Sequence, residues 1–190
     1  MTPATGRGGE TTDDADETDR ALVADLLRTV PDFPKPGILF WDLTTVLADA
    51  AGLAATTRLL GGTPAGGEVD VVVGIEARGF LLGAAVAQAL GLGVVPVRKQ
   101  GKLPAVAASR SYDLEYGSAT LELPADVLAP GARVLLVDDV LATGGTAGAA
   151  CDLVEECGAT VASLAVVLEL PELGGRGRLD GRPLHAVLQR

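Results

Sequence analysis

Residues 134–146, VLLVDDVLATGGT, are the part of the chain best suited to chemistry. The first four are apolar, which is typical of a buried strand in a parallel sheet, and two carboxylates, Asp138 and Asp139, follow directly. Ligands of open α/β sheets bind beyond the carboxyl ends of the strands, so both aspartates are expected at a ligand site. There they could accept hydrogen bonds from sugar hydroxyls or hold a divalent metal ion.

A turn of small residues follows the acid pair and precedes a helical run over residues 147–157. The amide groups of such a turn, together with the N-terminus of the next helix, attract a phosphate group. Glycines let the backbone approach the phosphate closely, and threonine hydroxyls add hydrogen-bond donors. Strand, acid pair, turn and helix together predict a site for a phosphorylated sugar. The residues expected to bind its phosphate are Ala142, Thr143, Gly144, Gly145 and Thr146.

The alternative is a solvated acid pair followed by a tight turn that binds nothing. Two adjacent carboxylates directly after a buried strand repel each other, and the turn has more donors than a simple connection needs. We therefore favour the ligand site. It is not a Walker A loop, because no Gly-Lys-Ser/Thr follows, and it does not match the GxGxxG pattern of dinucleotide-binding folds.

The same segment resembles the diphosphate-sugar signature of type I phosphoribosyltransferases, which bind 5-phosphoribosyl-1-diphosphate (PRPP). Three further stretches resemble the branch of this family that acts on adenine: DFPKPGILFWD at 32–42, GIEARGF at 74–80, and RKQGKLP with SYDLEYG within 98–117. The resemblance covers roughly residues 22–189. It implies that N9 of adenine displaces pyrophosphate from C1′ of PRPP, which gives AMP.

The resemblance also implies roles for individual residues. Glu115 would exchange a proton at purine N7 as a general acid/base, although the pattern alone suggests an exposed loop acid. Asp138 and Asp139 would face the ribose hydroxyls. For Arg98 a solvated position is an equal alternative to a substrate contact, and Tyr116 could close the site or be structural. The residues implied near pyrophosphate are Ala77, Arg78, Arg98 and Lys102, and those implied near adenine are Leu39, Phe40 and Trp41.

Trp41 departs from the family, which usually has Arg at this position. Adenine specificity survives if only the backbone is used there, whereas closure or affinity differs if the Arg side chain matters. The resemblance further implies a cis peptide bond between Glu76 and Ala77 and a homodimer. Mg²⁺ would enter with the substrate, with Asp138 and Asp139 as its candidate protein contacts.

Two other functions compete with this hypothesis. One is a transferase for another purine, such as xanthine or hypoxanthine and guanine, but the FPKPGILF and LEYG stretches favour adenine. The other is a PRPP-sensing regulator that binds nucleic acid. Such a regulator needs a basic face or an added DNA-binding module. The chain is acidic, and its N-terminal extension is too short for such a module.

Length and composition favour one α/β domain. The 190 residues are 48% hydrophobic but only 3% aromatic, so Ala, Val and Leu must fill the core. The net charge of −10 argues against nucleic acid and anionic membranes as partners. Residues 1–19 are expected to be a disordered acidic tail before a phosphoribosyltransferase-like domain at 20–190. No signal peptide is recognisable, and Cys151 and Cys157 are poorly placed to bridge, which fits the cytoplasm.

Alternating strands and helices predict a parallel sheet flanked by helices on both faces. A small flap (hood) is expected at about 31–47, and a lid loop at about 101–117 would exclude water from the reaction. Residues 112–114 and 119–123 are expected to form a hairpin. The strands are expected at 38–41, 69–75, 94–98, 134–137, 161–168 and 184–188, and the helices at 18–29, 48–60, 80–90 and 147–157.

Overall fold

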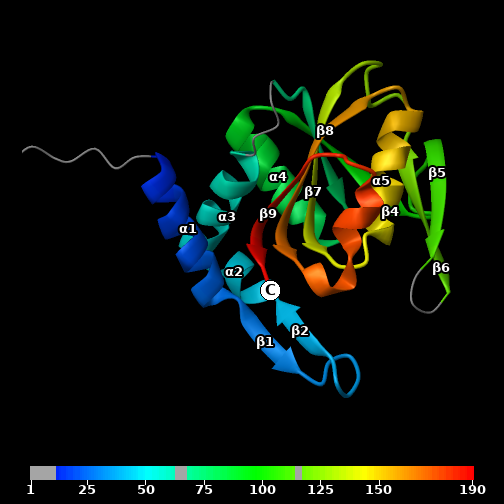
Figure 1. The fold of residues 1–190 in the computed structure, drawn as a ribbon. Coiled ribbons are helices and arrows are strands. Elements are labelled where there is room, and N and C mark those ends of the chain that lie inside the picture. The colour runs from blue at the N-terminus through cyan, green and yellow to red at the C-terminus, as the bar shows by residue number, and fades with distance from the viewer. Residues whose placement is uncertain (1–11, 63–67, 114–116) are drawn as a thin grey trace, which may run out of the picture. The chain divides into compact units, whose positions relative to one another are not determined.

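The computed structural model describes residues 12–62, 68–113 and 117–190 (Figure 1). The chain divides into two compact units, residues 1–55 and 56–190, and each is described by itself. Helix α3, Ala50–Gly61, contains the boundary between them.

The second unit is built on a mixed sheet with the strand order β5-β6-β4-β3-β7-β8-β9. The strands from β4 to β9 in this order pair in parallel, and β6 and β5 continue the sheet in antiparallel fashion at one edge. The predicted parallel sheet is therefore confirmed for its centre, and the antiparallel edge is an addition. The strands are β3 Val71–Ile75, β4 Gly93–Lys99, β5 Val106–Asp113, β6 Ser118–Pro124, β7 Arg133–Leu141, β8 Thr160–Glu169 and β9 Leu184–Gln189.

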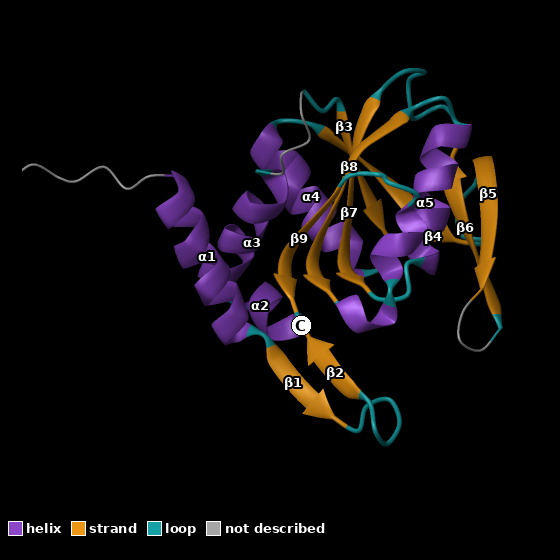
Figure 2. Cartoon of the chain, in the orientation of Figure 1, coloured by secondary structure: helices purple, strands orange, loops and turns teal. Residues whose placement is uncertain are grey.

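Helices α4, Arg78–Leu90, and α5, Gly145–Glu156, cover opposite faces of this sheet (Figure 2). The chain moves one way from β3 through α4 to β4 and the other way from β7 through α5 to β8, so right-handed connections place the two helices on opposite sides. Val73 and Ile75 belong to the core cluster that contains the buried face of α5. Neighbouring Val72 lies under α4, where a Cβ on Gly83 would be 3.6 Å from its side chain.

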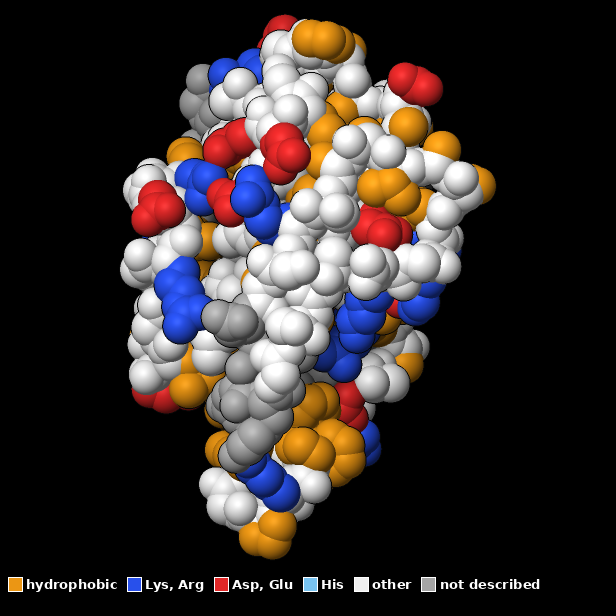
Figure 3. All heavy atoms as spheres, turned by 90° about the vertical axis from the view of Figure 1, so that its right-hand side faces the viewer, with side chains coloured by type: hydrophobic (Ala, Val, Ile, Leu, Met, Phe, Trp, Pro, Cys, Tyr) orange, Lys and Arg blue, Asp and Glu red, His pale blue; other side chains and the backbone are white. Residues whose placement is uncertain are grey.

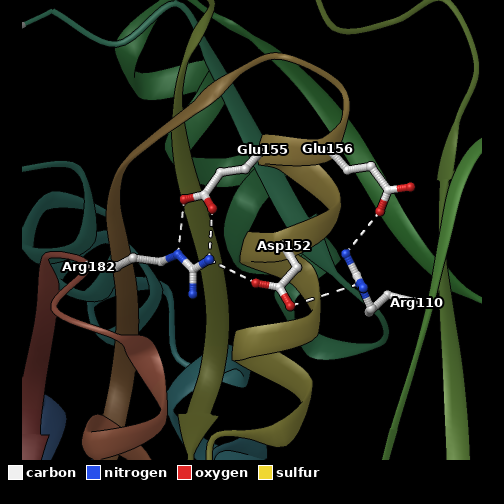
Figure 4. Close-up of polar contacts among 5 residues, drawn as sticks. All are labelled: Arg110, Asp152, Glu155, Glu156 and Arg182. Atoms are coloured by element: carbon white, nitrogen blue, oxygen red, sulfur yellow. Dashed lines mark hydrogen bonds and ion pairs between the residues drawn. The ribbon is translucent and has the colours of Figure 1, made fainter.

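Polar contacts on the outer face of α5 tie two other segments to this helix (Figure 4). Arg182, which precedes β9, donates hydrogen bonds to Asp152 at 2.8 Å and to both carboxylate oxygens of Glu155 at 2.9 and 2.7 Å. Arg110 of β5 donates one to Glu156 at 3.0 Å. These contacts fix α5 between the antiparallel edge of the sheet and the segment before the last strand.

The first unit contains α1 Thr12–Leu26, a hairpin of β1 Arg28–Pro31 and β2 Leu39–Asp42, α2 Thr44–Ala48 and the first turns of α3. The helix expected at 18–29 is thus wrong at both ends. It ends at Leu26 because the next residues pair with β2, where Val30 lies opposite Phe40 and Arg28 forms an ion pair with Asp42.

The start of α1 also corrects the expected disordered tail, since residues 12–19 are helical. Asp13 and Asp14 lie in the first helical turn, where negative charge is favourable beside the helix N-terminus. An acidic composition therefore marks a solvated helix end here and not disorder. The part of the predicted tail at residues 1–11 lies outside the described residues.

The middle of the stretch expected to be a lid loop is a strand, β5, Val106–Asp113. β5 begins at Val106 and pairs with β6 as far as Asp113, which lies opposite Ser118. The hairpin forms because one of its faces is apolar, with Ala108, Leu121 and Leu123 buried in the core. Outside β5, the described part of the expected lid is 101–105 and Gly117, and residues 114–116 lie outside the described residues. None of the described helices is long and apolar enough to cross a bilayer.

Candidate active site

A pocket of about 460 Å³ opens where β3 and β7 end, entirely within the second unit. The turn that follows β7 forms one side of it, and the segment that follows β3 lies opposite. Its lining contains Glu76, Ala77, Arg78, Lys99, Tyr112, Ala119, Asp138, Asp139 and the continuous stretch 140–147. The acid pair and the segment 142–146, here called the phosphate turn, are neighbours in the sequence, and the fold brings the distant Arg78 to the same pocket, as expected.

Asp138 and Asp139 lie inside β7 and not after its end, which corrects the expected strand boundary. Pairing with β3 stops at Val137, but pairing with β8 continues to Leu141. The two aspartates are therefore held by one neighbouring strand and open toward the pocket on the other side. Only 8% of Asp138 and 7% of Asp139 is exposed.

The two carboxylates differ in their contacts. Asp139 forms an ion pair with Arg78, and its backbone amide donates a hydrogen bond to Asp138 Oδ1 at 2.8 Å. Burial raises the pKa of Asp138 well above its usual value, and the negative charge of Asp139 raises it further, whereas Arg78 acts in the opposite direction. The pair therefore resists carrying two negative charges until a cationic group or a substrate reaches it.

Arg78 reaches Asp139 because the start of α4 packs directly on the sheet. A Cβ on Gly79 would lie 2.7 Å from the carbonyl oxygen of Val137, and one on Gly74 would lie 2.6 Å from the carbonyl oxygen of Gly79. Only glycine permits this approach at both positions. The peptide bond between Glu76 and Ala77 is cis, which confirms the expectation from the family resemblance.

The phosphate turn leads into α5 through Gly144, which caps the helix with a φ of +82°. Glycine adopts this left-handed conformation without strain and offers no side chain that could occupy the first amides of the helix. The first residues of the helix, Gly145, Thr146 and Ala147, line the same pocket as Thr143. All five residues expected to bind phosphate line the pocket, and their binding of phosphate stays a prediction.

Glu76 organises the cations that were expected to meet pyrophosphate, and the sequence analysis missed this residue. Its side chain is 10% exposed, forms an ion pair with Lys102, lies 3.5 Å from Arg98 Nε and accepts the amide of Lys99 at 3.0 Å. Burial alone would raise the pKa of Glu76, but the hydrogen bonds and charges of Lys102, Lys99 and Arg98 outweigh it and lower the pKa. The role of Glu76 could have been suspected from its position, since it is an acid that directly follows a strand in GIEARGF.

The expected pyrophosphate residues therefore fall into two groups. Ala77 and Arg78 line the pocket, whereas Arg98 and Lys102 are bound to Glu76 and do not line it. Lys99 lines the pocket as well.

The expected adenine contacts lie in the first unit, on β2. Leu39 is 52% exposed, and the ring of Phe40 meets the ring of Phe33 edge to face at 5.0 Å. Phe33, which is 50% exposed, is an aromatic surface that the sequence analysis did not single out. Trp41 is partly buried on the same strand. Glu115 and Tyr116 lie outside the described residues, so their expected roles stay predictions.

The side chains of the pocket suit a metal ion whose ligands are mostly substrate oxygens and water. Among the described residues, no three His, Cys, Asp or Glu side chains are grouped so that they could hold a metal ion by themselves. Asp138 and Asp139 offer carboxylate oxygens to the pocket, and Mg²⁺ is commonly held by one or two carboxylates together with substrate phosphates and water. The residues thus fit Mg²⁺ that is bound mainly through PRPP.

Asp138→Asn is expected to stabilise the protein and to lower its activity. The folded-state pKa of Asp138 is above its usual value of 3.8, so the favourable contribution of the protonated acid is lost as pH rises through the raised pKa. Asparagine carries no charge at any pH, so the variant does not lose this stability as the pH rises. In metal-free buffer at pH 7 the melting temperature should rise by about 2–4 °C, on the order of 1 kcal/mol for a chain of this size.

The gain in melting temperature from Asp138→Asn should shrink as the pH is lowered toward 4, and turnover at pH 7 should fall by about tenfold. Thermal unfolding followed by circular dichroism at several pH values measures the first effect. A gain that is independent of pH would show that the charge of Asp138 is not its origin.

The comparisons with known proteins identify the family of the chain. Residues 42–178 match the family model of the phosphoribosyl transferase domain, so the chain belongs to the phosphoribosyltransferase family. Over 175 residues it is 59% identical to an adenine phosphoribosyltransferase of Saccharopolyspora erythraea, covering 91% of this chain and 94% of that protein.

Solved structures place the chain beside the same enzymes. A crystal structure of adenine phosphoribosyltransferase from Thermoanaerobacter pseudethanolicus has a TM-score of 0.85 and 44% identity, with 90% of this chain and 99% of that chain covered. The enzyme of Saccharomyces cerevisiae, complexed with an imino-altritol bisphosphate and adenine, has a TM-score of 0.86 and 36% identity, with 90% and 99% covered. The resemblance to the adenine branch of the family is thereby confirmed.

Proposed function

We propose that the protein transfers the phosphoribosyl group of PRPP to N9 of adenine, which gives AMP and pyrophosphate, as in purine salvage. The observation that carries this proposal is one pocket in which the glycine- and threonine-rich segment 142–146, the buried acid pair and Arg78 meet. Relatives and structural neighbours that bear the name adenine phosphoribosyltransferase support the choice of base.

The first task of the site is to hold the 5′-phosphoribosyl group. The amides of the phosphate turn and of the first turn of α5 donate hydrogen bonds to the phosphate oxygens, and Thr143 and Thr146 add hydroxyl donors. Asp138 and Asp139 accept hydrogen bonds from the ribose hydroxyls. Their charge also favours the positive charge that grows at C1′ as the bond to pyrophosphate breaks.

The second task is to balance the charge of the departing pyrophosphate. Arg78 and Lys99 already line the pocket, while Glu76 holds Lys102 and Arg98 close to it. A bound diphosphate competes with Glu76 for Lys102, because both offer anionic oxygens. Glu76 thus holds the ammonium group of Lys102 near the pocket before the substrate binds, and the diphosphate can then take over this ion pair.

The third task is to bind the purine and to manage its proton. The exposed ring of Phe33 and the partly buried ring of Phe40 offer aromatic faces for stacking, and backbone groups near Leu39 and Trp41 would read the N1 and N6 edge. As the bond from N9 to C1′ forms, Glu115 exchanges a proton at N7. The segment around Glu115 would act as the lid.

Mg²⁺, when it is bound with PRPP, would neutralise part of the diphosphate charge. Turnover should therefore fall sharply in excess EDTA and recover when Mg²⁺ is restored. Full turnover in EDTA would remove the metal from the proposal.

The deciding experiment supplies the purified chain with PRPP, Mg²⁺ and one purine base at a time, and follows nucleotide and pyrophosphate by chromatography. AMP from adenine, with little product from hypoxanthine, guanine or xanthine, is expected. Product from another base instead of adenine would assign a different transferase. Absence of any product, together with a gel shift on DNA, would favour the regulator. On the face that Figure 3 shows, basic side chains are interspersed with acidic ones, which does not favour nucleic acid.

We further propose a homodimer that works in the cytoplasm. Leu81 of α4 is 61% exposed and offers an apolar contact for a second copy. Cys151 and Cys157 are both free, which suits a reducing compartment. Sedimentation equilibrium should give twice the mass of one chain, and the mass of a single chain would contradict the dimer.

A further inference from the structure

We infer that Arg176 is a positioning residue for the phosphate turn, which it steadies through its pairing with Glu169 and through the backbone of neighbouring Gly175. The inference rests on the proposed function, because it assigns the support of the same site. Arg176 lies on η2, Gly175–Leu179, in a Gly- and Arg-rich segment for which the sequence analysis found no role beyond a loop.

The first observation is a buried carboxylate with a single strong partner. Glu169 is the last residue of β8 and is 3% exposed. Arg176 donates to both of its oxygens, from Nε at 2.9 Å and from Nη2 at 2.6 Å. Gln189 of β9 donates to the same carboxylate at 2.8 Å. This two-pronged geometry is the most directional ion pair available to proteins, and it fixes η2 against the carboxyl ends of β8 and β9.

The second observation is the backbone contact between η2 and the phosphate turn. A Cβ on Gly144 would lie 2.5 Å from the carbonyl oxygen of Gly175, and a Cβ on Gly175 would lie 2.2 Å from the carbonyl oxygen of Ala142. Two backbones thus meet with no side chain between them. Arg176 directly follows Gly175. Its ion pair with Glu169 therefore fixes the position of the backbone that contacts Gly144 in the phosphate turn.

The rest of η2 does not replace this anchor. Leu179 is 1% exposed and holds the far end of η2 in the core, while Leu170, next to Glu169, donates its amide to the carbonyl of Leu141 at 2.9 Å. Between these points, Gly174, Gly175 and Gly177 have no side chains that could hold the segment, and the hydrogen bonds from Gly174 to Pro171 at 3.0 Å and from Gly177 to Gly174 at 3.1 Å stay within it. Loss of the ion pair therefore frees the part of the segment that touches Gly144.

Arg176 is not placed to touch the substrate, because it does not line the pocket and its side chain is 52% exposed. Its effect should therefore appear in the affinity for the phosphorylated substrate and not in the chemical step. A displacement of about 1 Å in such a turn is enough to change the use of a substrate by one to two orders of magnitude.

The test compares Arg176→Met, which keeps the length of the side chain, with Arg178→Met on the same η2. Arg178 is exposed and makes no ion pair with any residue that the structure describes. Arg176→Met should raise the KM for PRPP by about tenfold, with much smaller changes in the KM for adenine and in kcat. Arg178→Met should match the unaltered protein in all three.

Arg176→Lys supplies the second arm, because it keeps the charge but loses the two-pronged geometry. It should raise the KM for PRPP by about threefold, between the other two proteins. This variant decides the matter if Arg176→Met does not fold. An unchanged KM for PRPP in the folded variants, or equal rises in both KM values, would overturn the positioning role. A failure of the proposed function would look different, since the unaltered protein would then form no AMP.

Discussion

Replacing Glu115 by Gln is expected to slow AMP formation in a single turnover by about 100-fold or more, the usual range for an acid/base group. The amide keeps the shape of the side chain, but it cannot take a proton from purine N7 or return one. Substrate binding should change much less than the rate. Glu115→Leu should be at least as damaging, because it removes the hydrogen bond as well.

The measurement must isolate the chemical step, because slow release of product can hide a chemical defect in the steady state. Enzyme in excess over PRPP, mixed rapidly with adenine and quenched, gives the single-turnover rate. Glu172→Gln is a matched control, since Glu172 is an exposed acid on η1, Pro171–Leu173, outside the pocket lining. A wild-type rate for Glu115→Gln would mean that another group moves the proton and that the transfer of the lid motif is wrong at its central position.

The sequence pattern predicted the fold correctly where the local signals are strong. Apolar runs such as 134–137 and 161–168 have the length and composition of buried parallel strands, and both are strands in the structure. The segment from Ala142 to Thr146 was also predictable as a ligand-facing connection, because glycines and threonines before a helix are typical of anion sites, although α5 begins at Gly145 and so includes its last two residues. Its five residues all line the pocket.

Boundaries that depend on a distant partner were not predictable. β7 continues through Asp138 only because β8 continues beside it, and nothing in the local sequence records this pairing. The early start of α1 at Thr12 was not predictable, because a solvated helix and a disordered tail share the same polar composition. In the same way, the contact of Gly175 with Gly144 joins segments that are far apart in the chain and whose glycines alone suggested loops.

That glycine contact changes the expected effect of a substitution in the phosphate turn. From the sequence, a side chain at Gly144 is expected to weaken PRPP binding while the fold stays intact. In the structure, Gly144 has a φ of +82° and its Cβ position lies 2.5 Å from the backbone of Gly175. Gly144→Ala should therefore raise the KM for PRPP by about 100-fold and also lower the melting temperature, since the strain is roughly 1–3 kcal/mol.

Two further variants separate the loss of binding from the loss of stability. Gly148→Ala is the matched control, because a Cβ there would lie 3.5 Å from the carbonyl oxygen of Arg178, an ordinary contact on the same helix. It should leave both PRPP binding and melting temperature close to those of the unaltered protein. Thr143→Ala removes only a hydroxyl donor, so it should weaken PRPP binding by about tenfold without lowering the melting temperature. Titration calorimetry with PRPP in the absence of adenine measures each affinity. If Gly144→Ala and Thr143→Ala both bind PRPP as the unaltered protein does, the turn does not hold the phosphate, and the anion must be sought elsewhere in the pocket.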